Sequence, residues 1–291
     1  ANTDALVGDG GNDTISAVLQ TAGATGTTVA PGDSVDGKGG TDTFTISVAG
    51  DNGSPGYTIS AITLDNVEKL FLSNFDTNTA SNAITTVDAG LMTGLTTVGL
   101  SSSGADGDSK ISGLKNNVDA EMRSGAGDLT LDYNGAYVVT GTADTQKLTV
   151  SALTGGDFIA NGIETLNINS ELAKSTLNAA TSDAVKTVNV TGDQNLIITT
   201  ALVFAGTDNT TTIDGTLDAS TFTGNLTAGV SGNKTVSIKG GSGDDTFKLG
   251  STLTKNDVVA GGAGTDTLTM TAVAAGGLDE QFTNVSGIET V

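Results

Sequence analysis

The sequence predicts an all-β protein of the solenoid type, built from short strands and tight turns that repeat along the chain. Three observations support this: glycine–aspartate repeats near both ends, strand signals about every ten residues, and a scarcity of large core residues. Hydrophobic residues make up 36% of the 291 residues, but aromatic residues only 4%, and tryptophan is absent. A core of Val, Ile, Leu, Ala and a few Phe suits the thin layers of a solenoid better than a thick sandwich.

Residues 1–49 form the first predicted segment and carry imperfect copies of the pattern G-G-x-G-x-D-x-U-x, in which U is a large apolar residue. One copy begins at residue 8 and another at residue 37, each with a non-glycine in second place. A half copy, an aspartate two residues before Leu or Val, lies nine residues upstream of each following aspartate. The candidate metal ligands of this segment are Asp4, Gly8, Gly11, Asp13, Asp33, Gly37, Gly40 and Asp42.

Residues 50–230 form the middle segment, which has no clear nonapeptide. Apolar and polar residues alternate in short runs such as 95–98 and 185–190, as in strands with one buried face. The segment is therefore predicted to be β-helical, with a sandwich as the open alternative. The only stretches with plausible helical character are short, around 115–122 and 171–183, and they look like turns on a β framework.

Residues 231–291 form the third segment and contain two complete nonapeptides, at 240–248 and 261–269, with a half copy between them. The candidate metal ligands here are Gly240, Gly241, Gly243, Asp245, Asp257, Gly261, Gly262, Gly264 and Asp266.

The residue types of the nonapeptide suit a calcium site. Glycine allows tight turns that direct carbonyl groups inward, aspartate supplies an anionic oxygen, and U starts a buried strand. One loop offers too few oxygens, so stacked loops are needed to provide the six to eight that Ca²⁺ takes. With two nonapeptides per coil of about 20 residues, Asp245 and Asp266 are expected on one edge, and likewise Asp13 and Asp33.

A second repeat places a glutamate after a glycine or asparagine, as in Gly-Ile-Glu-Thr. The glutamates are Glu68, Glu164 and Glu289, and each follows an aspartate in a turn by a similar interval: Asp42, Asp144 and Asp266, respectively. The alternation around each glutamate predicts a strand. The glutamate itself is read as a solvated or turn-capping residue, with a metal role as the alternative.

The charge and the missing residue types exclude several functions. With 33 acidic and 12 basic residues the net charge is −21, which opposes binding to nucleic acid and to anionic membranes; a cation is the natural partner. The absence of Cys and His excludes disulfides, thiolate sites and His-dependent zinc or catalytic sites. No apolar stretch approaches the length of a membrane span, so membrane insertion is not expected.

The sequence does not indicate an enzyme. It has neither H-E-x-x-H nor a G-x-S-x-G elbow, and its single arginine, Arg123, is expected to form an ion pair with Glu121 nearby. No signal peptide is visible at the start, and both ends fall within repeats. The chain is therefore expected to be a piece of a longer protein.

The nonapeptides together with the Gly-Ile-Glu-Thr element resemble the RTX (calcium-binding nonapeptide repeat) proteins exported by type I secretion. Within this group the chain looks most like the surface-layer (S-layer) proteins of Gram-negative bacteria of the Caulobacter type, mainly over residues 216–270. The resemblance implies a right-handed parallel β-helix or β-roll, with Ca²⁺ between coils and folding after export. It also implies an N-terminal anchoring region, through which a cell-surface glycan could be bound, and a C-terminal secretion signal.

The function expected from this resemblance is that of a secreted structural protein whose calcium-stabilised solenoid self-assembles into a lattice on the cell surface. One alternative is a calcium-dependent adhesin that presents a face to a cell, a glycan or ice. Another is the non-catalytic RTX part of a secreted enzyme, or a polysaccharide lyase or epimerase.

Overall fold

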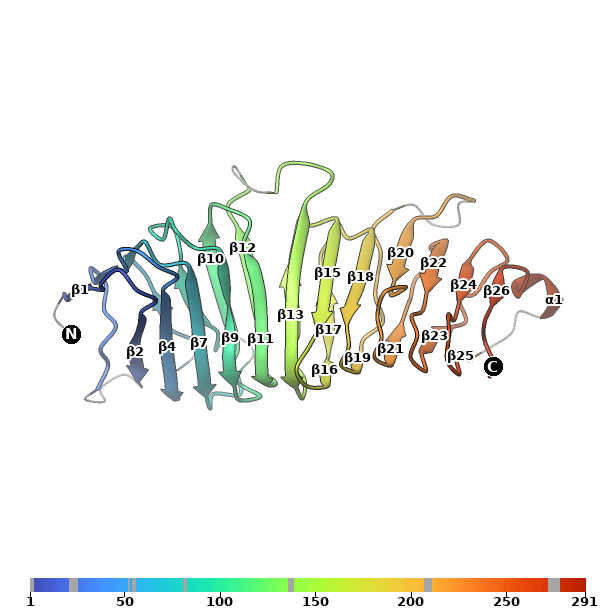
Figure 1. Cartoon of the computed structure of the whole chain (residues 1–291), viewed down its shortest axis with the longest axis horizontal. Helices are drawn as coiled ribbons and strands as arrows, with labels where there is room; N and C mark the ends of the chain where they lie inside the picture. Colours follow the sequence, from blue (N-terminus) through green and yellow to red (C-terminus); the bar gives the residue numbers. More distant parts are fainter. Residues whose placement is uncertain are drawn as a thin grey trace. The chain divides into compact units, whose positions relative to one another are not determined.

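The computed structural model is an all-β parallel solenoid, which confirms the predicted fold class (Figure 1). It describes residues 3–20, 26–51, 53, 56–80, 83–135, 139–206, 211–271 and 278–291. The chain divides into two compact units. Unit 1 contains Ala1–Gly141 and Leu153–Ala160, and unit 2 contains Thr142–Ala152 and Asn161–Val291.

Unit 1 has three parallel sheets. The large sheet follows the order β2 (Thr14–Gln20), β4 (Thr43–Gly50), β7 (Lys69–Asp76), β9 (Thr97–Ser103) and β11 (Asp119–Gly125). A second sheet contains β5 (Thr58–Ile59), β8 (Thr85–Asp88), β10 (Ser109–Leu114), β12 (Leu129–Tyr133) and β14 (Asp157–Ala160). The third sheet is formed by β1 (Ala5–Val7), β3 (Ser34–Asp36) and β6 (Thr63–Asp65). Because consecutive strands alternate between sheets, each sheet is built from successive coils.

Unit 2 has the same construction with two main sheets. The larger one contains β13 (Thr145–Leu153), β15 (Thr165–Ser170), β18 (Thr187–Gly192), β20 (Gly215–Asp218), β22 (Val236–Lys239), β24 (Val258–Ala260) and β26 (Val285–Ser286). The other contains β16 (Ser175–Leu177), β19 (Leu196–Ile198), β21 (Leu226–Gly229), β23 (Thr246–Gly250) and β25 (Thr267–Met270). A short strand, β17 (Ala179–Thr181), and a four-residue helix, α1 (Leu278–Gln281), complete the described elements of this unit.

The core follows from the alternation of residues along each strand. In β4 the side chains of Phe44, Ile46 and Val48 are buried, while the threonine and serine residues between them face outward. Successive coils stack these apolar residues in register, for example Phe44 on Leu70. Aromatic side chains are few, and some of them, such as Phe222 and Phe247 in unit 2, are fully buried in the core.

Neither of the two stretches with plausible helical character is a helix, and both contain strands as well as turns. Residues 119–122 belong to β11, and the segment 171–183 contains β16 and β17. In β11 the apolar residues Ala120 and Met122 are two positions apart and both buried, so burial follows the strand period of two. Stacking on β9 therefore decides the conformation, whatever the local helix propensity.

The coils are less uniform in length than the repeat pattern predicts. The strand register pairs Thr145 with Thr165 in unit 2, which is close to the expected repeat. In unit 1 it pairs Thr14 with Thr43, so that coil is clearly longer. In unit 1, the longer coils include a strand of the third sheet, which is formed by β1, β3 and β6. The length of each coil decides which aspartates become neighbours.

Candidate metal centre

The glycine-rich loops of consecutive coils stack directly on one another. In unit 2, the carbonyl oxygens of Gly241 and Gly243 lie against the Cα atoms of Gly262 and Gly264, so that a Cβ at either later position would collide with backbone. Both later glycines also have positive φ values, 109° and 123°. Side chains are thus excluded by space and by conformation, as the nonapeptide pattern predicts.

The other predicted glycines occupy equivalent places. The carbonyl of Gly11 lies against Gly40 in unit 1, where φ is 129°. The first glycine of each loop contacts its own aspartate and a carbonyl of the following coil; this holds for Gly8, Gly37, Gly240 and Gly261. The stacked loops therefore place backbone carbonyl oxygens beside aspartate carboxylates.

The C-terminal aspartates form a ladder across coils, as predicted for Asp245 and Asp266. Oδ1 of Asp266 accepts a hydrogen bond from the backbone N–H of Asp245 (2.8 Å). Oδ1 of Asp245 in turn accepts from the N–H of Leu226 (2.8 Å), and its Oδ2 accepts from Gly241 (2.8 Å). Each carboxylate thus binds the backbone of the preceding coil.

The N-terminal aspartates are laddered too, but with a different pairing from the predicted one. Oδ1 of Asp42 accepts from the N–H of Asp13 (2.7 Å), and Oδ1 of Asp33 accepts from the N–H of Asp4 (2.9 Å). The expected neighbours Asp13 and Asp33 instead precede strands of different sheets, β2 and β3. The reason is the long first coil, in which β2 pairs with β4 and the partner of Asp13 becomes Asp42.

Two aspartates of the half repeats, Asp33 and Asp257, act as turn caps. Oδ2 of Asp33 accepts from the N–H of Ala30 (2.6 Å). Asp257 accepts from the N–H of Val236 through Oδ1 (2.8 Å) and from the N–H and hydroxyl of Thr254 through Oδ2 (2.7 and 3.0 Å). Both oxygens of Asp33 and of Asp257 thus accept hydrogen bonds, as do those of Asp245.

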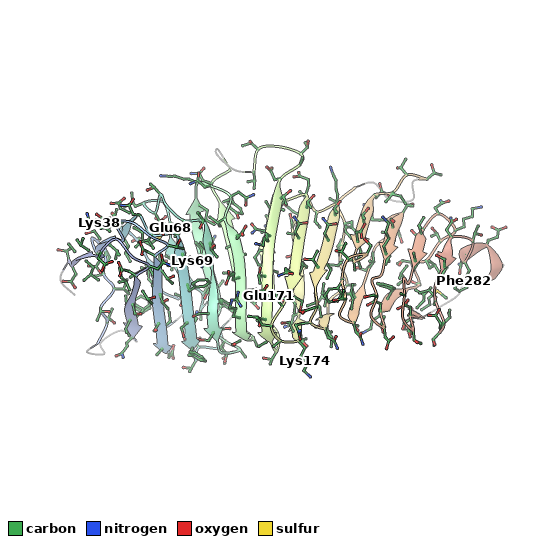
Figure 2. The ribbon with its side chains drawn as sticks, viewed as in Figure 1. Lys38, Glu68, Lys69, Glu171, Lys174 and Phe282 are labelled. Carbon is green, nitrogen blue, oxygen red and sulfur yellow. The ribbon has the colours of Figure 1, made fainter. Side chains whose placement is uncertain are left out.

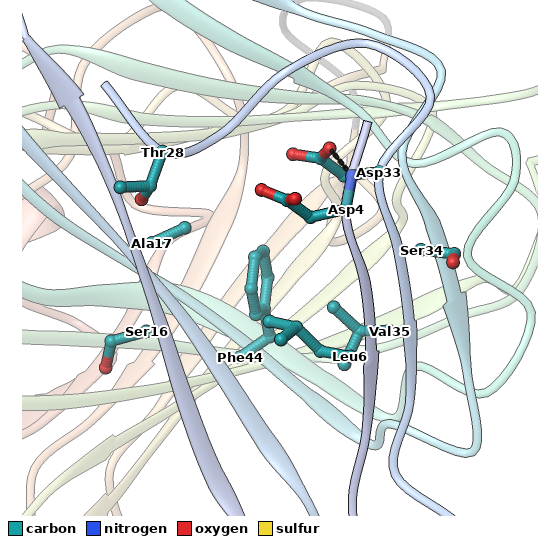
Figure 3. A pocket seen from close by; sticks show the side chains of 9 residues that line it. All are labelled: Asp4, Leu6, Ser16, Ala17, Thr28, Asp33, Ser34, Val35 and Phe44. Carbon is teal, nitrogen blue, oxygen red and sulfur yellow. Dashed lines mark hydrogen bonds between the residues drawn. The ribbon is translucent and has the colours of Figure 1, made fainter. Parts of the chain in front are cut away.

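A cavity of about 250 Å³ lies beside Asp4 and Asp33 in unit 1 (Figure 3). Its lining includes apolar side chains such as Leu6, Val35 and Phe44, and the two carboxylates lie near each other on one side of it. Oδ1 and Oδ2 of Asp33 each accept a hydrogen bond from a backbone N–H group at this cavity.

The three repeat glutamates continue the ladders. Their sequence pattern leaves their role open between turn capping and metal binding. Oε2 of Glu68, Glu164 and Glu289 accepts a hydrogen bond from the backbone N–H of Asp42 (2.7 Å), Asp144 (2.8 Å) and Asp266 (2.7 Å), respectively. The N–H of each glutamate donates back to the carbonyl of the same aspartate. Glu68 lies immediately before β7; Figure 2 labels it together with Lys69, the first residue of that strand. The turn-capping interpretation is therefore correct in the sense of a cap between coils, and the spacing of about one coil is its signal.

Two ladder aspartates keep a buried oxygen without a partner. Asp42 is 1% exposed and Asp266 0%, and Oδ2 of each has no hydrogen-bond donor. Burial raises the pKa of Asp266, and the nearby charges of Glu289 and Asp244 raise it further. Burial also raises the pKa of Asp245. A buried anionic oxygen without a donor is costly, so a bound cation or a proton is needed there.

A cation at these loops would depend on backbone oxygens. Within the described residues, no group of three or more acidic side chains converges as a metal site. Ca²⁺ nevertheless accepts carbonyl oxygens and water along with carboxylates, and the stacked glycine carbonyls supply such atoms. The donor set of hard oxygens, together with the unpartnered Oδ2 atoms, fits Ca²⁺ chemically.

A further carboxylate ladder occurs in the middle segment, where no nonapeptide marks it. The N–H of Asp128 donates to Oδ1 of Asp108 (3.1 Å), and the N–H of Asp157 donates to Oδ1 of Asp128 (2.7 Å). Burial, and then the charges of Asp108 and Asp157, raise the pKa of Asp128 to about 6. Each of these aspartates follows a glycine, which is the only signal that could have found them.

The fold and these ladders define the class of the protein: a parallel β-solenoid whose coils are joined by acidic side chains. No family model matches the chain, and neither a curated protein nor a solved structure matches it. In the part of the chain that the structure describes, no helix has the length and apolar character needed to cross a membrane.

Proposed function

We propose that this chain is the calcium-stabilised solenoid of a secreted surface-layer protein, which assembles with copies of itself into a lattice on the cell exterior. The observation that carries the proposal is the pair of stacked nonapeptide clusters with buried, unpartnered oxygens on Asp42 and Asp266. A cation or a proton would satisfy these oxygens, and in a chain of net charge −21 the proposal assigns that role to Ca²⁺. The RTX-like repeats add the expectation of export by type I secretion.

Calcium would act here as a condition of folding. Without a cation, carboxylates stacked one coil apart repel each other, and the glycine loops are entropically costly to order. A cation between the loops neutralises the charge and fixes the backbone, so its binding energy becomes folding energy. The repeat loops would remain unfolded where calcium is scarce, and they would fold outside the cell, where calcium is available.

Self-association is expected to follow from the same neutralisation. A strongly acidic surface keeps copies apart by mutual repulsion, and bound Ca²⁺ lowers that repulsion while making the coils rigid. This makes a second copy of the chain the favoured partner, and it assigns no catalytic role to any residue.

The test follows strand content by circular dichroism and particle size by light scattering, first in EGTA and then in millimolar Ca²⁺, with Mg²⁺ as the control cation. We expect strand signal and assembly to increase with Ca²⁺, and Mg²⁺ to be a poor substitute because it resists irregular many-oxygen sites. Equal strand signal in EGTA and Ca²⁺ at low ionic strength would contradict the proposal. Ordered monomers that bind a cell or a glycan, with no lattice by electron microscopy, would instead support an adhesin.

A further inference from the structure

We propose that the repeat glutamates at the two ladder ends complete a distinct Ca²⁺ site, formed by Asp266, Gly287 and Glu289 in unit 2 and by Asp42, Asn66 and Glu68 in unit 1. The inference rests on the proposed calcium binding and assigns ligands outside the nonapeptides. Each site combines an aspartate carboxylate, a backbone carbonyl of the next coil and the carboxylate of the glutamate two residues later.

In unit 2, two oxygens converge on the space beside Gly261. A Cβ on Gly261 would collide with the carbonyl oxygen of Gly287 and with Oδ2 of Asp266. That Oδ2 is fully buried and has no donor. Oε2 of Glu289 accepts a hydrogen bond from the N–H of Asp266 (2.7 Å), which holds the glutamate carboxylate beside the backbone of the same aspartate.

Unit 1 repeats this arrangement independently. A Cβ on Gly37 would collide with the carbonyl oxygen of Asn66 and with Oδ2 of Asp42, which is again buried and without a donor. Glu68 binds the N–H of Asp42 through Oε2 (2.7 Å). Gly8 and Gly240 make the same contact with a carbonyl and an aspartate. What distinguishes the two proposed sites is the buried Oδ2 without a donor together with the adjacent glutamate.

The backbone conformation supports the carbonyl as a ligand. Asn66 and Gly287 both have positive φ, 52° and 59°. Asparagine and glycine are the residues that adopt this left-handed conformation most readily. The turn brings the carbonyl oxygen against the first glycine of the preceding loop, beside the unpartnered Oδ2. Two carboxylates and a carbonyl are hard oxygen ligands, and water would complete the six to eight that Ca²⁺ takes.

Glu164 provides a matched control within the same chain. Its Oε2 accepts a hydrogen bond from the N–H of Asp144 (2.8 Å), and its own N–H donates to the Asp144 carbonyl. We call this reciprocal pair of hydrogen bonds, which Glu68 and Glu289 also make, the clamp. Asp144, however, is only half-buried, and no oxygen of its side chain is both buried and without a partner. The clamp therefore exists without the site, which separates the structural role of the glutamate from its proposed ligand role.

The experiment compares Ca²⁺ stoichiometry, by equilibrium dialysis, for the full chain and the variants Glu68→Gln, Glu289→Gln and Glu164→Gln. Glutamine keeps an oxygen that can accept the aspartate N–H but removes the charge. We expect Glu68→Gln and Glu289→Gln each to lose one Ca²⁺ or to weaken one site at least tenfold, and Glu164→Gln to bind as the unmodified chain does. If the unmodified chain binds no Ca²⁺, the proposed function fails as well. If it binds Ca²⁺ and all three variants match it, only this inference is overturned.

A second measurement needs no variant. In the unmodified chain with ¹³C-labelled glutamate carboxyl groups, the infrared carboxylate stretch of glutamate should shift on addition of Ca²⁺ and return with EGTA. A glutamate band that does not move while Ca²⁺ binds would overturn the inference, because every bound ion would then be held without glutamate.

Discussion

The side chain of Glu289 and the backbone of Asp266 hold each other across one coil: Oε2 of Glu289 accepts the N–H of Asp266 at 2.7 Å, and the carbonyl of Asp266 accepts the N–H of Glu289 at 3.0 Å. These two residues are 23 positions apart in the chain. Glu164 and Asp144 make the same pair of bonds. An acidic side chain thus binds the backbone N–H of the residue immediately before strand β13 or β25, where the loop enters the sheet.

The first prediction concerns this clamp at Glu164, away from the proposed calcium sites. Glu164→Ala should lower the free energy of unfolding by about 1–3 kcal/mol, because the N–H of Asp144 loses a charged acceptor in a part-buried place. Glu164→Gln should cost less, since its amide oxygen can still accept. Denaturant unfolding followed by circular dichroism measures both. Equal losses for Ala and Gln would mean that the hydrogen bond contributes little.

The second prediction compares two adjacent glycines of one nonapeptide. Gly40 has φ of 129°, and a Cβ there would collide with the carbonyl oxygen of Gly11, whereas a Cβ on Gly39 would meet nothing within 4 Å. Gly40→Ala should therefore destabilise unit 1 by about 1–3 kcal/mol or more through strain and overpacking. Gly39→Ala should change the stability by no more than about 0.5 kcal/mol.

The measurement is the unfolding midpoint of both variants at one fixed Ca²⁺ concentration. Because both substitutions add the same methyl group to neighbouring residues, a general effect of alanine on the unfolded chain is common to both. Equal midpoints for the two variants would contradict the stacking of Gly40 on Gly11.

The third prediction concerns pH and Asp128, which lies outside the nonapeptide loops. Its pKa in the folded chain is about 6, above the ordinary value of 3.8, because of burial and the charges of Asp108 and Asp157. The folded state therefore binds this proton more tightly than the unfolded state. The resulting stabilisation is fully present below pH 3.8 and is lost as the pH rises through about 6.

Asp128→Asn should remove this dependence, because the amide keeps an acceptor for the N–H of Asp157 but carries no charge. The variant should be more stable than the unmodified chain above pH 6, and the difference should shrink as the pH falls toward 3.8. Asp106→Asn, at an exposed position in a nearby loop, controls for the loss of one negative charge. The same pH dependence in the Asp106 and Asp128 variants would contradict the assignment.

The sequence by itself determined the all-β solenoid class, the stacking of the glycine loops and the neighbourhood of Asp245 and Asp266. These features depend on local rules: glycine where a loop turns, aspartate before a strand, and alternation of buried and exposed residues. In unit 2 these rules also predict which residues are neighbours one coil apart, because the coil between the two nonapeptides is close to the repeat length. The link from Asp42, Asp144 and Asp266 to the three glutamates was visible as a spacing, although its chemistry was not.

Only the tertiary structure decided the rest. The long first coil pairs Asp13 with Asp42, and the nonapeptide pattern does not predict the length of that coil. The pairing of β11 with β9 makes residues 119–122 part of a strand. The stacking of coils also brings Asp108, Asp128 and Asp157 into one ladder. Whether a carboxylate oxygen has a donor, as in Asp257, or is buried without one, as in Asp266, depends on the backbone around it and on the adjacent coil. Contacts between coils join residues that are a whole coil apart in the chain, beyond the reach of local sequence rules.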